Sequence, residues 1–234
     1  MPTAAKPVYL LAGGPSSIAK GGSDPLVQAA LRQAGVETPS VAYVGAASND
    51  NAGFRGMITR LLQAAGAGEV KLAALSGRRC DPEKAMRVIE VCHIVFMSGG
   101  DVEAGMKVLA ETNMIDFFHE QHRKGKPFFG ASAGSIMLAK SWVRWRNPGE
   151  DSSAELFPCL GIAGLYCDTH GEADNWEELC VLTRLIPAGN ISYGIPSGTA
   201  LISNPDGSVQ AFGGGVARFT LRNQAVEQIP PIED

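Results

Sequence analysis

The residues best suited to chemistry lie in one short segment, residues 128–135, which reads Phe-Phe-Gly-Ala-Ser-Ala-Gly-Ser. The segment has the form Gly-x-Ser-x-Gly centred on Ser132, and it stands where a buried apolar run gives way to a helical pattern. A tight strand-to-helix turn of this form lifts a serine hydroxyl above the end of its strand. The N–H of Ala133, at the start of the helix, is then placed to donate to an oxyanion. The segment therefore predicts a serine nucleophile, the alternative being a turn whose small residues serve packing alone.

A serine nucleophile needs a general base, and the chain offers four histidines. His93 begins an apolar run and is expected to be structural. His119 and His122 lie in a charged helical stretch and are expected to face solvent. His170 follows an expected strand at its carboxyl end, where open α/β sheets gather their chemistry. We therefore expect His170 to accept the proton of Ser132.

The third member of such a site is a carboxylate that orients the imidazole. Asp168 stands two positions before His170, so both side chains are expected to leave the same face of the strand. That position suits a pocket wall. Glu150 and Asp151 lie in a polar stretch that can reach over the site. Glu155 and Glu172 are further candidates, and the residues alone leave the choice open.

A second glycine loop, Ser98-Gly99-Gly100-Asp101, also follows a buried apolar run. Paired glycines let backbone N–H groups approach a ligand. We expect the N–H of Gly100 to be the second oxyanion donor. Asp101 is expected to cap the next helix, and we place it with Asp168 among the substrate-binding residues.

No cofactor or metal is expected. The loop at residues 12–17 has neither the spacing of a dinucleotide fingerprint nor that of a phosphate loop. Cys159, Cys167 and His170 match no common zinc spacing. The aromatic and basic residues between Trp142 and Arg146 favour a loop that faces substrate or a second copy of the chain over one that binds nucleic acid.

The elements that must position these residues follow an alternating pattern. Continuously apolar runs separated by helical patterns predict a parallel sheet covered on both faces. Strands are expected at residues 8–12, 41–46, 70–75, 93–97, 127–129 and 165–170. Helices are expected at residues 25–33, 53–65, 82–91, within 102–123, and after residue 132.

In the C-terminal half of the chain the pattern is less regular. A polar stretch at residues 144–153 is expected to be an ordered surface loop. Asp174-Asn175-Trp176-Glu177 reads as a capping box that opens a helix to about residue 186. Alternating apolar residues after residue 208 predict antiparallel strands at the edge of the sheet. We expect a three-layer, doubly wound α/β fold in a single domain, residues 1–234.

Composition narrows the class of protein. The chain of 234 residues has 45% hydrophobic residues and a formal net charge of −4, which is typical of a soluble globular domain and does not favour nucleic acid or an anionic membrane. Its apolar stretches are too short for a signal peptide or a membrane span. Five cysteines without a Cys-x-x-Cys pair indicate reduced thiols, and we expect a cytoplasmic protein.

Taken together, these residues resemble the dipeptidase E and cyanophycinase family of serine peptidases, which has the class I glutamine amidotransferase-like fold. The resemblance covers most of the chain. Its markers are Gly13-Gly14, Ser98-Gly99-Gly100-Asp101, Gly130-Ala131-Ser132-Ala133-Gly134, Leu160-Gly161 leading to Asp168-Thr169-His170, and the segment from Gly194 to Leu201. The resemblance implies that Ser132 is the nucleophile and His170 the base. It also implies an acid between them, which favours Glu150 or its neighbour Asp151.

The family cleaves peptide bonds after aspartate, in short aspartyl peptides or in cyanophycin. This chain departs from the family after His170, where cyanophycinase-like members carry several arginines and only Arg184 stands here. It also has Pro196-Ser197 where acidic residues are common. We therefore expect a serine peptidase that hydrolyses short peptides through an acyl-enzyme. The alternatives are a cyanophycinase-like hydrolase and a catalytically silent sensor or binding module. Whether the chain forms a homodimer is left open.

Overall fold

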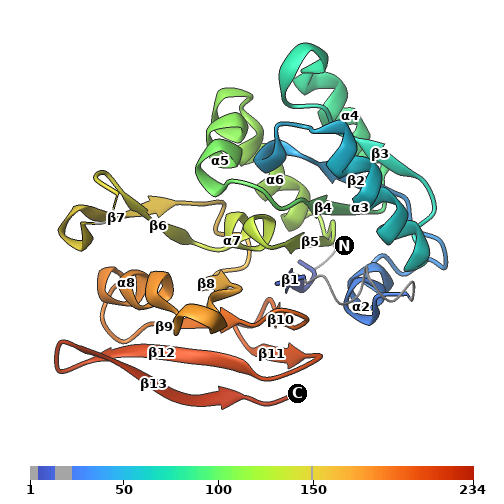
Figure 1. The fold of residues 1–234 in the computed structure, drawn as a ribbon. Coiled ribbons are helices and arrows are strands. Elements are labelled where there is room, and N and C mark those ends of the chain that lie inside the picture. Colours follow the sequence, from blue (N-terminus) through green and yellow to red (C-terminus); the bar gives the residue numbers. More distant parts are fainter. Residues whose placement is uncertain (1–4, 14–22, 149) are drawn as a thin grey trace.

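The computed structural model describes residues 5–13, 23–148 and 150–234 (Figure 1). In this part of the chain seven strands form the main sheet, in the order β11-β10-β1-β5-β4-β2-β3. The five strands from β1 to β3 in that order run parallel, and β10 and β11 are antiparallel to their neighbours. The strands are β1 (Val8–Leu11), β2 (Val41–Val44), β3 (Val70–Leu72), β4 (Ile94–Met97), β5 (Phe128–Ala131), β10 (Ala200–Ser203) and β11 (Val209–Phe212). The expected α/β fold with a mostly parallel sheet is confirmed.

Helices cover both faces of the main sheet because its strands are apolar on both sides. Successive side chains of a strand point to opposite faces. In β1, Leu10 packs into one core and Leu11 into the other. The first core includes helices α4 (Pro82–Val91), α5 (Val102–Glu111), α6 (Met114–Arg123) and α7 (Ala133–Leu138). The second includes helices α2 (Pro25–Arg32) and α3 (Ala52–Ala64).

Short polar side chains begin several of these helices. The side-chain oxygens of Asp24, Asn51, Asp81 and Asp101 accept a backbone N–H in the first turn of α2, α3, α4 and α5, respectively. Such caps satisfy N–H groups that have no partner within the helix. The expected starts of these helices are confirmed to within a residue.

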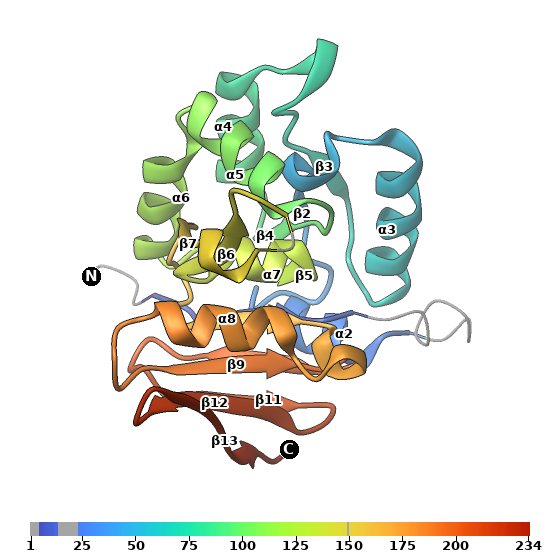
Figure 2. The same ribbon diagram turned by 60° about the vertical axis from the view of Figure 1, so that its left-hand side comes forward.

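The expected antiparallel C-terminal strands are confirmed, and β10 and β11 form one edge of the main sheet. The other C-terminal strands differ from the expectation in belonging to a second sheet. The second sheet has the order β13-β12-β9-β8, and its strands β9, β12 and β13 lie below the parallel strands of the main sheet in Figure 1 and Figure 2. Its strands are β8 (Tyr166–Thr169), β9 (Ile191–Ile195), β12 (Val216–Arg222) and β13 (Ala225–Ile232), and helix α8 (Glu177–Leu185) packs against it.

Two local expectations need correction. The stretch expected as a surface loop, residues 144–153, includes the end of a strand, β6 (Ser141–Trp145), and β7 (Ala154–Pro158) begins directly after it. In the described part of the chain β6 and β7 form a hairpin and pair only with each other. The carboxylate of Glu155 bridges Arg144 and Arg146 across this hairpin. The residue before α8 is Trp176, whose side chain makes no cap; Asp174 instead accepts the N–H of Trp176 at 3.0 Å. No helix in the described ranges is long and apolar enough to cross a bilayer.

Candidate active site

Ser132 stands between β5 and α7 in a backbone conformation that few side chains adopt. Its φ is 54° and its ψ is −126°. Non-glycine residues at positive φ are uncommon, and such strain is concentrated at functional sites. The N–H of Ser132 donates to the carbonyl of Leu11 at 2.8 Å, which fixes the turn to the end of β1. The strand-to-helix turn expected from the sequence is present at this residue.

The two glycines of the motif are required by the close approach of helix α7 to the sheet. A methyl group on Gly130 would lie 2.5 Å from the carbonyl of Gly134. A methyl group on Gly134 would lie 2.0 Å from the carbonyl oxygen of Met97, at the end of β4. Both distances are far inside van der Waals contact, and in both cases the obstacle is backbone. Packing therefore dictates glycine on either side of Ser132.

The loop after β4 lies next to Ser132. A methyl group on Gly99 would lie 3.3 Å from Cβ and 3.9 Å from Oγ of Ser132. Gly100 has a φ of 144°, and a methyl group there would lie 2.1 Å from the carbonyl oxygen of Ala47. Within the described residues, no acceptor binds the backbone N–H of Gly99 or Gly100. Gly99 thus lies beside Ser132, and among the described residues its backbone N–H has no acceptor.

His170 follows β8 in the second sheet and is also strained, with a φ of 66°. Its backbone N–H donates to Ile195 at 3.2 Å. Its Nδ1 lies 3.0 Å from the hydroxyl of Ser197, with which it forms a hydrogen bond. The carboxylate of Glu172 accepts the backbone N–H of Ser197 at 3.0 Å. These three residues form one polar cluster, which we call the His170 cluster.

The end of β1 connects the His170 cluster to the Ser132 turn. Leu11 accepts the N–H of Ser132 on one side of β1. On the other side, Ala12 donates to Thr199 at 3.0 Å and Gly13 accepts from Gly198 at 2.7 Å. The turn that carries Ser197 is therefore bound to the same strand end as Ser132. No hydrogen bond joins Ser132 Oγ to His170 in the described structure, and such bonds often tighten only when substrate binds.

A buried tryptophan supports the loop that carries His170. The chain folds back at Trp176, whose backbone N–H donates to the carbonyl oxygen of Gly171 at 2.7 Å. Its ring would lie 2.7 Å from a methyl group on either Gly171 or Gly194. The indole thus fills the space between the His170 loop and strand β9. It fixes where the loop runs.

The two carboxylates favoured as the orienting acid, Glu150 and Asp151, lie beside the β6–β7 hairpin. Glu150 is exposed beside the β6–β7 hairpin, accepts from the Asn147 amide at 3.1 Å and forms no hydrogen bond with His170. Its neighbour Asp151 accepts from Trp145 and faces Arg184 at 3.8 Å. The structure therefore does not bring either of them to Nδ1 of His170, in contrast to the expectation, because the hairpin carries both along helix α8.

Asp101 and Asp168 are each bound to a nearby backbone N–H. Asp101 is exposed and accepts from Ala104 at 2.8 Å, as expected of a helix cap. Asp168 is 6% exposed and accepts from Thr169 at 2.7 Å. Burial and, to a smaller extent, the nearby carboxylate of Glu178 together raise the pKa of Asp168 to about 7. Asp168 is thus a buried carboxyl group beside β9.

Ser197 is the residue of the His170 cluster that sequence reasoning did not assign a role. The one sequence feature that pointed to this position was that Pro196-Ser197 stands where the resembling family commonly has acidic residues. Glu172 was among the candidate acids. Neither pattern revealed that the two residues meet, because they stand 25 positions apart and belong to different loops.

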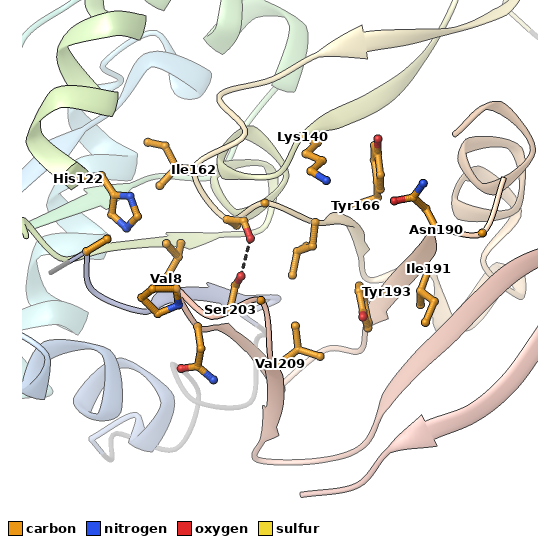
Figure 3. A pocket seen from close by; sticks show the side chains of 18 residues that line it. Val8, His122, Lys140, Ile162, Tyr166, Asn190, Ile191, Tyr193, Ser203 and Val209 are labelled. Carbon is orange, nitrogen blue, oxygen red and sulfur yellow. Dashed lines mark hydrogen bonds between the residues drawn. The ribbon is translucent and has the colours of Figure 1, made fainter. Parts of the chain in front are cut away.

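A separate pocket of about 440 Å³ lies at the other end of β1 (Figure 3). Val8, at the start of that strand, lines it, together with Lys140, Tyr166 and Tyr193. Lys140 Nζ stands 5.3 Å from the centre of the Tyr166 ring. None of the lining residues belongs to the Ser132 turn or to the His170 cluster. We therefore assign this pocket no part in the chemistry at Ser132.

With this geometry in view, comparison with known proteins shows the family. A model of peptidase family S51 matches residues 9–209, which is most of the chain. The chain belongs to peptidase family S51. This is a family of serine peptidases, so membership implies a serine hydrolase. The resemblance noted from the sequence is thereby confirmed.

The relatives within this family are distant. A cyanophycinase of Trichormus variabilis is 23% identical over 220 residues, covering 92% of this chain and 73% of the relative. A peptidase E of Pasteurella multocida is 28% identical over 142 residues, covering 57% of this chain and 59% of the relative. The crystal structure of a peptidase from an acI-B1 Actinobacterium superposes with a TM-score of 0.71 at 17% identity, covering 98% of this chain and 97% of that chain. At that identity the structural match shows the fold alone.

Proposed function

We propose that this S51 family member is a peptidase that hydrolyses short peptides, with Ser132 as nucleophile and His170 as general base. The observation that carries the proposal is the strained Ser132 turn, which lies beside the glycine loop after β4. Strain of this kind persists only where the surrounding packing enforces it. Here Gly130 and Gly134 allow that packing, and the result is a half-buried serine at a helix start.

The proposed reaction is acyl transfer in two steps. His170 accepts the proton of Ser132 at Nε2 while Ser132 Oγ attacks the scissile carbonyl carbon. The N–H groups of Gly100 and Ala133 stabilise the oxyanion that forms. His170 then returns its proton to the leaving amine, and an acyl-enzyme remains. A water molecule, deprotonated by His170, hydrolyses the ester and restores Ser132.

Substrate selection is the finer part of the proposal. Asp101 is exposed and adjacent to Gly100, so its carboxylate is placed to attract the N-terminal ammonium of a short peptide. Asp168 is buried, and we propose that it acts only as the wall beneath the site. A relative named cyanophycinase suggests a second substrate class, but the chain lacks the arginines expected after His170. We therefore favour short peptides.

The test is reaction with a fluorophosphonate probe, which phosphonylates activated serines, followed by peptide mapping. Wild-type protein is expected to be labelled at Ser132, and Ser132→Ala is expected to remain unlabelled. A panel of dipeptides with N-terminal Asp, Glu, Gly or Leu then gives the specificity. Loss of the triad serine should reduce hydrolysis by several orders of magnitude. A folded wild-type protein that neither reacts nor hydrolyses any dipeptide would instead support a binding module.

A further inference from the structure

The position that usually belongs to a carboxylate in a serine hydrolase is occupied here by a hydroxyl. Nδ1 of His170 bonds to Ser197 Oγ at 3.0 Å. In a Ser-His-acid site the carboxylate fixes the imidazole tautomer and stabilises the imidazolium that forms during the reaction. A neutral hydroxyl alone supplies orientation but no negative charge. The charge must come from elsewhere.

Glu172 stands directly behind Ser197. Its carboxylate accepts the backbone N–H of Ser197 at 3.0 Å. Although burial acts to raise the pKa of Glu172, hydrogen bonds from the Ser197 hydroxyl and from backbone N–H groups lower it, and the positive charge of His170 lowers it further. Glu172 is therefore an ionised acceptor that is bound to the backbone N–H of Ser197, with the Ser197 hydroxyl near enough to help lower its pKa.

The direction of each hydrogen bond follows from the number of protons available. An ionised carboxylate can only accept, so the single proton of the Ser197 hydroxyl is donated to Glu172. The oxygen of Ser197 then accepts the proton on Nδ1 of His170. Nε2 is left without a proton, which is the tautomer that a base for Ser132 requires.

We propose that Glu172, acting through the Ser197 hydroxyl, is the carboxylate that orients His170 and stabilises its protonated form. This inference rests on the proposed function and makes Glu172 and Ser197 positioning residues. The other carboxylates on the same strand and loop are engaged elsewhere: Asp168 accepts the N–H of Thr169, and Asp174 accepts the N–H of Trp176.

The experiment measures the second-order rate of fluorophosphonate labelling of Ser132, which needs no knowledge of the substrate. A hydrogen bond to a charged group stabilises the protonated imidazole that forms as Ser132 reacts. Removing that hydrogen bond should therefore slow labelling about 10- to 100-fold. Glu172→Gln and Ser197→Ala are each expected to show this loss. Ser197→Thr, which keeps the hydroxyl, is expected to label at close to the wild-type rate. Glu177→Gln, an exposed carboxylate on α8, is the matched control and should leave the rate unchanged.

A rescue distinguishes positioning from a merely structural role. Ser197→Glu places a carboxylate directly at Nδ1, so in the Glu172→Gln background it should restore most of the labelling rate. The double variant Glu172→Gln with Ser197→Ala should label no more slowly than Ser197→Ala alone, since the two residues act as one unit. The inference would be overturned if Glu172→Gln were labelled at the wild-type rate. It would also be overturned if the folded double variant Glu172→Gln with Ser197→Glu were labelled no faster than Glu172→Gln alone.

The inference and the proposed function fail in distinguishable ways. A folded wild-type protein that resists the probe contradicts the proposed function. The inference is then judged from the NMR signal of the His170 Nδ1 proton, which hydrogen bonding moves downfield. Glu172→Gln should shift this signal upfield, and an unchanged signal would overturn the inference.

Discussion

The proposed nucleophile and the proposed base come from two parts of the molecule that hold their residues by different means. Ser132 lies at the end of a parallel strand in the main sheet, where the neighbouring contacts of Gly130 and Gly134 are all to backbone. His170 lies in the smaller sheet, where the ring of Trp176 and the hydroxyl of Ser197 determine its position. Backbone contacts cannot give way without moving strands, whereas side-chain contacts can. The nucleophile side should therefore be the less tolerant of change.

The largest effect is expected from Gly134→Ala. The added methyl group would meet the Met97 carbonyl oxygen at 2.0 Å, so helix α7 must move away from the sheet and take the Ser132 turn with it. Overpacking of this kind lowers the free energy of unfolding by about 1–3 kcal/mol or more. We expect at least that loss in urea denaturation and no measurable fluorophosphonate labelling.

Gly56→Ala is the matched control for this substitution. A methyl group on Gly56, within α3, would meet only Arg60 at 3.9 Å. Alanine is preferred over glycine in a helix, so the free energy of unfolding should rise by about 0.5–1 kcal/mol. If a folded Gly134→Ala variant were labelled at the wild-type rate, the claim that the backbone contacts of Gly134 fix the Ser132 turn would be contradicted.

A smaller effect is expected from Gly194→Ala on the base side. Here the added methyl group would lie 2.7 Å from the indole of Trp176, and this ring can shift. The free energy of unfolding should fall by about 1 kcal/mol and the labelling rate about tenfold, both less than for Gly134→Ala. Tryptophan fluorescence reports the movement of the ring. If Gly194→Ala proves the more damaging of the two, the proposed contrast between the two sides is wrong.

The next effect is a pH dependence of the thermal stability that comes from Asp168, whose pKa is raised to about 7, mainly by burial. The folded protein holds this proton more tightly than the unfolded chain, in which an aspartate titrates at about 3.9. The stability due to this proton is fully present below about pH 4 and is lost as the pH rises through about 7. Asp168→Asn imitates the protonated carboxyl group, so it should raise Tm at about pH 8 and change it little at about pH 4.

The same variant tests whether Asp168 only forms a wall. Its labelling rate at neutral pH should stay close to that of the wild type. A Tm gain that is equal at both pH values, or no gain at either, would show that the buried carboxylate carries no such penalty.

The smallest effect is expected from Glu150→Gln. The side chain is exposed, and it contacts Asn147 rather than His170. Exposed substitutions of this kind usually change the free energy of unfolding by less than about 0.5 kcal/mol. Labelling should match the wild type, in contrast to Glu172→Gln. A large loss of labelling in Glu150→Gln would return the role of orienting acid to the hairpin.

The sequence predicted the main sheet and the strand-to-helix turn at Ser132 well because both depend on local patterns. Apolar runs such as residues 41–46 and caps such as Asp81 signal elements within a few neighbouring residues. The glycines around Ser132 are likewise dictated by contacts within one turn and its nearest strands.

The base side was harder to predict because its contacts join segments far apart in the chain. Trp176 supports both Gly171 and Gly194, and Ser197 meets Glu172 across 25 positions. No local pattern encodes such meetings. The hairpin of β6 and β7 was missed for a similar reason, since its strands pair only with each other and show no buried apolar run.

The most direct test of the central claim is a crystal structure of the wild-type protein after reaction with the fluorophosphonate. We predict a phosphonyl group on Ser132 Oγ, with one phosphonyl oxygen bound by the N–H groups of Gly100 and Ala133. Nε2 of His170 should lie within hydrogen-bond distance of the adduct. An adduct on another residue, or an imidazole that faces away from Ser132, would contradict the account.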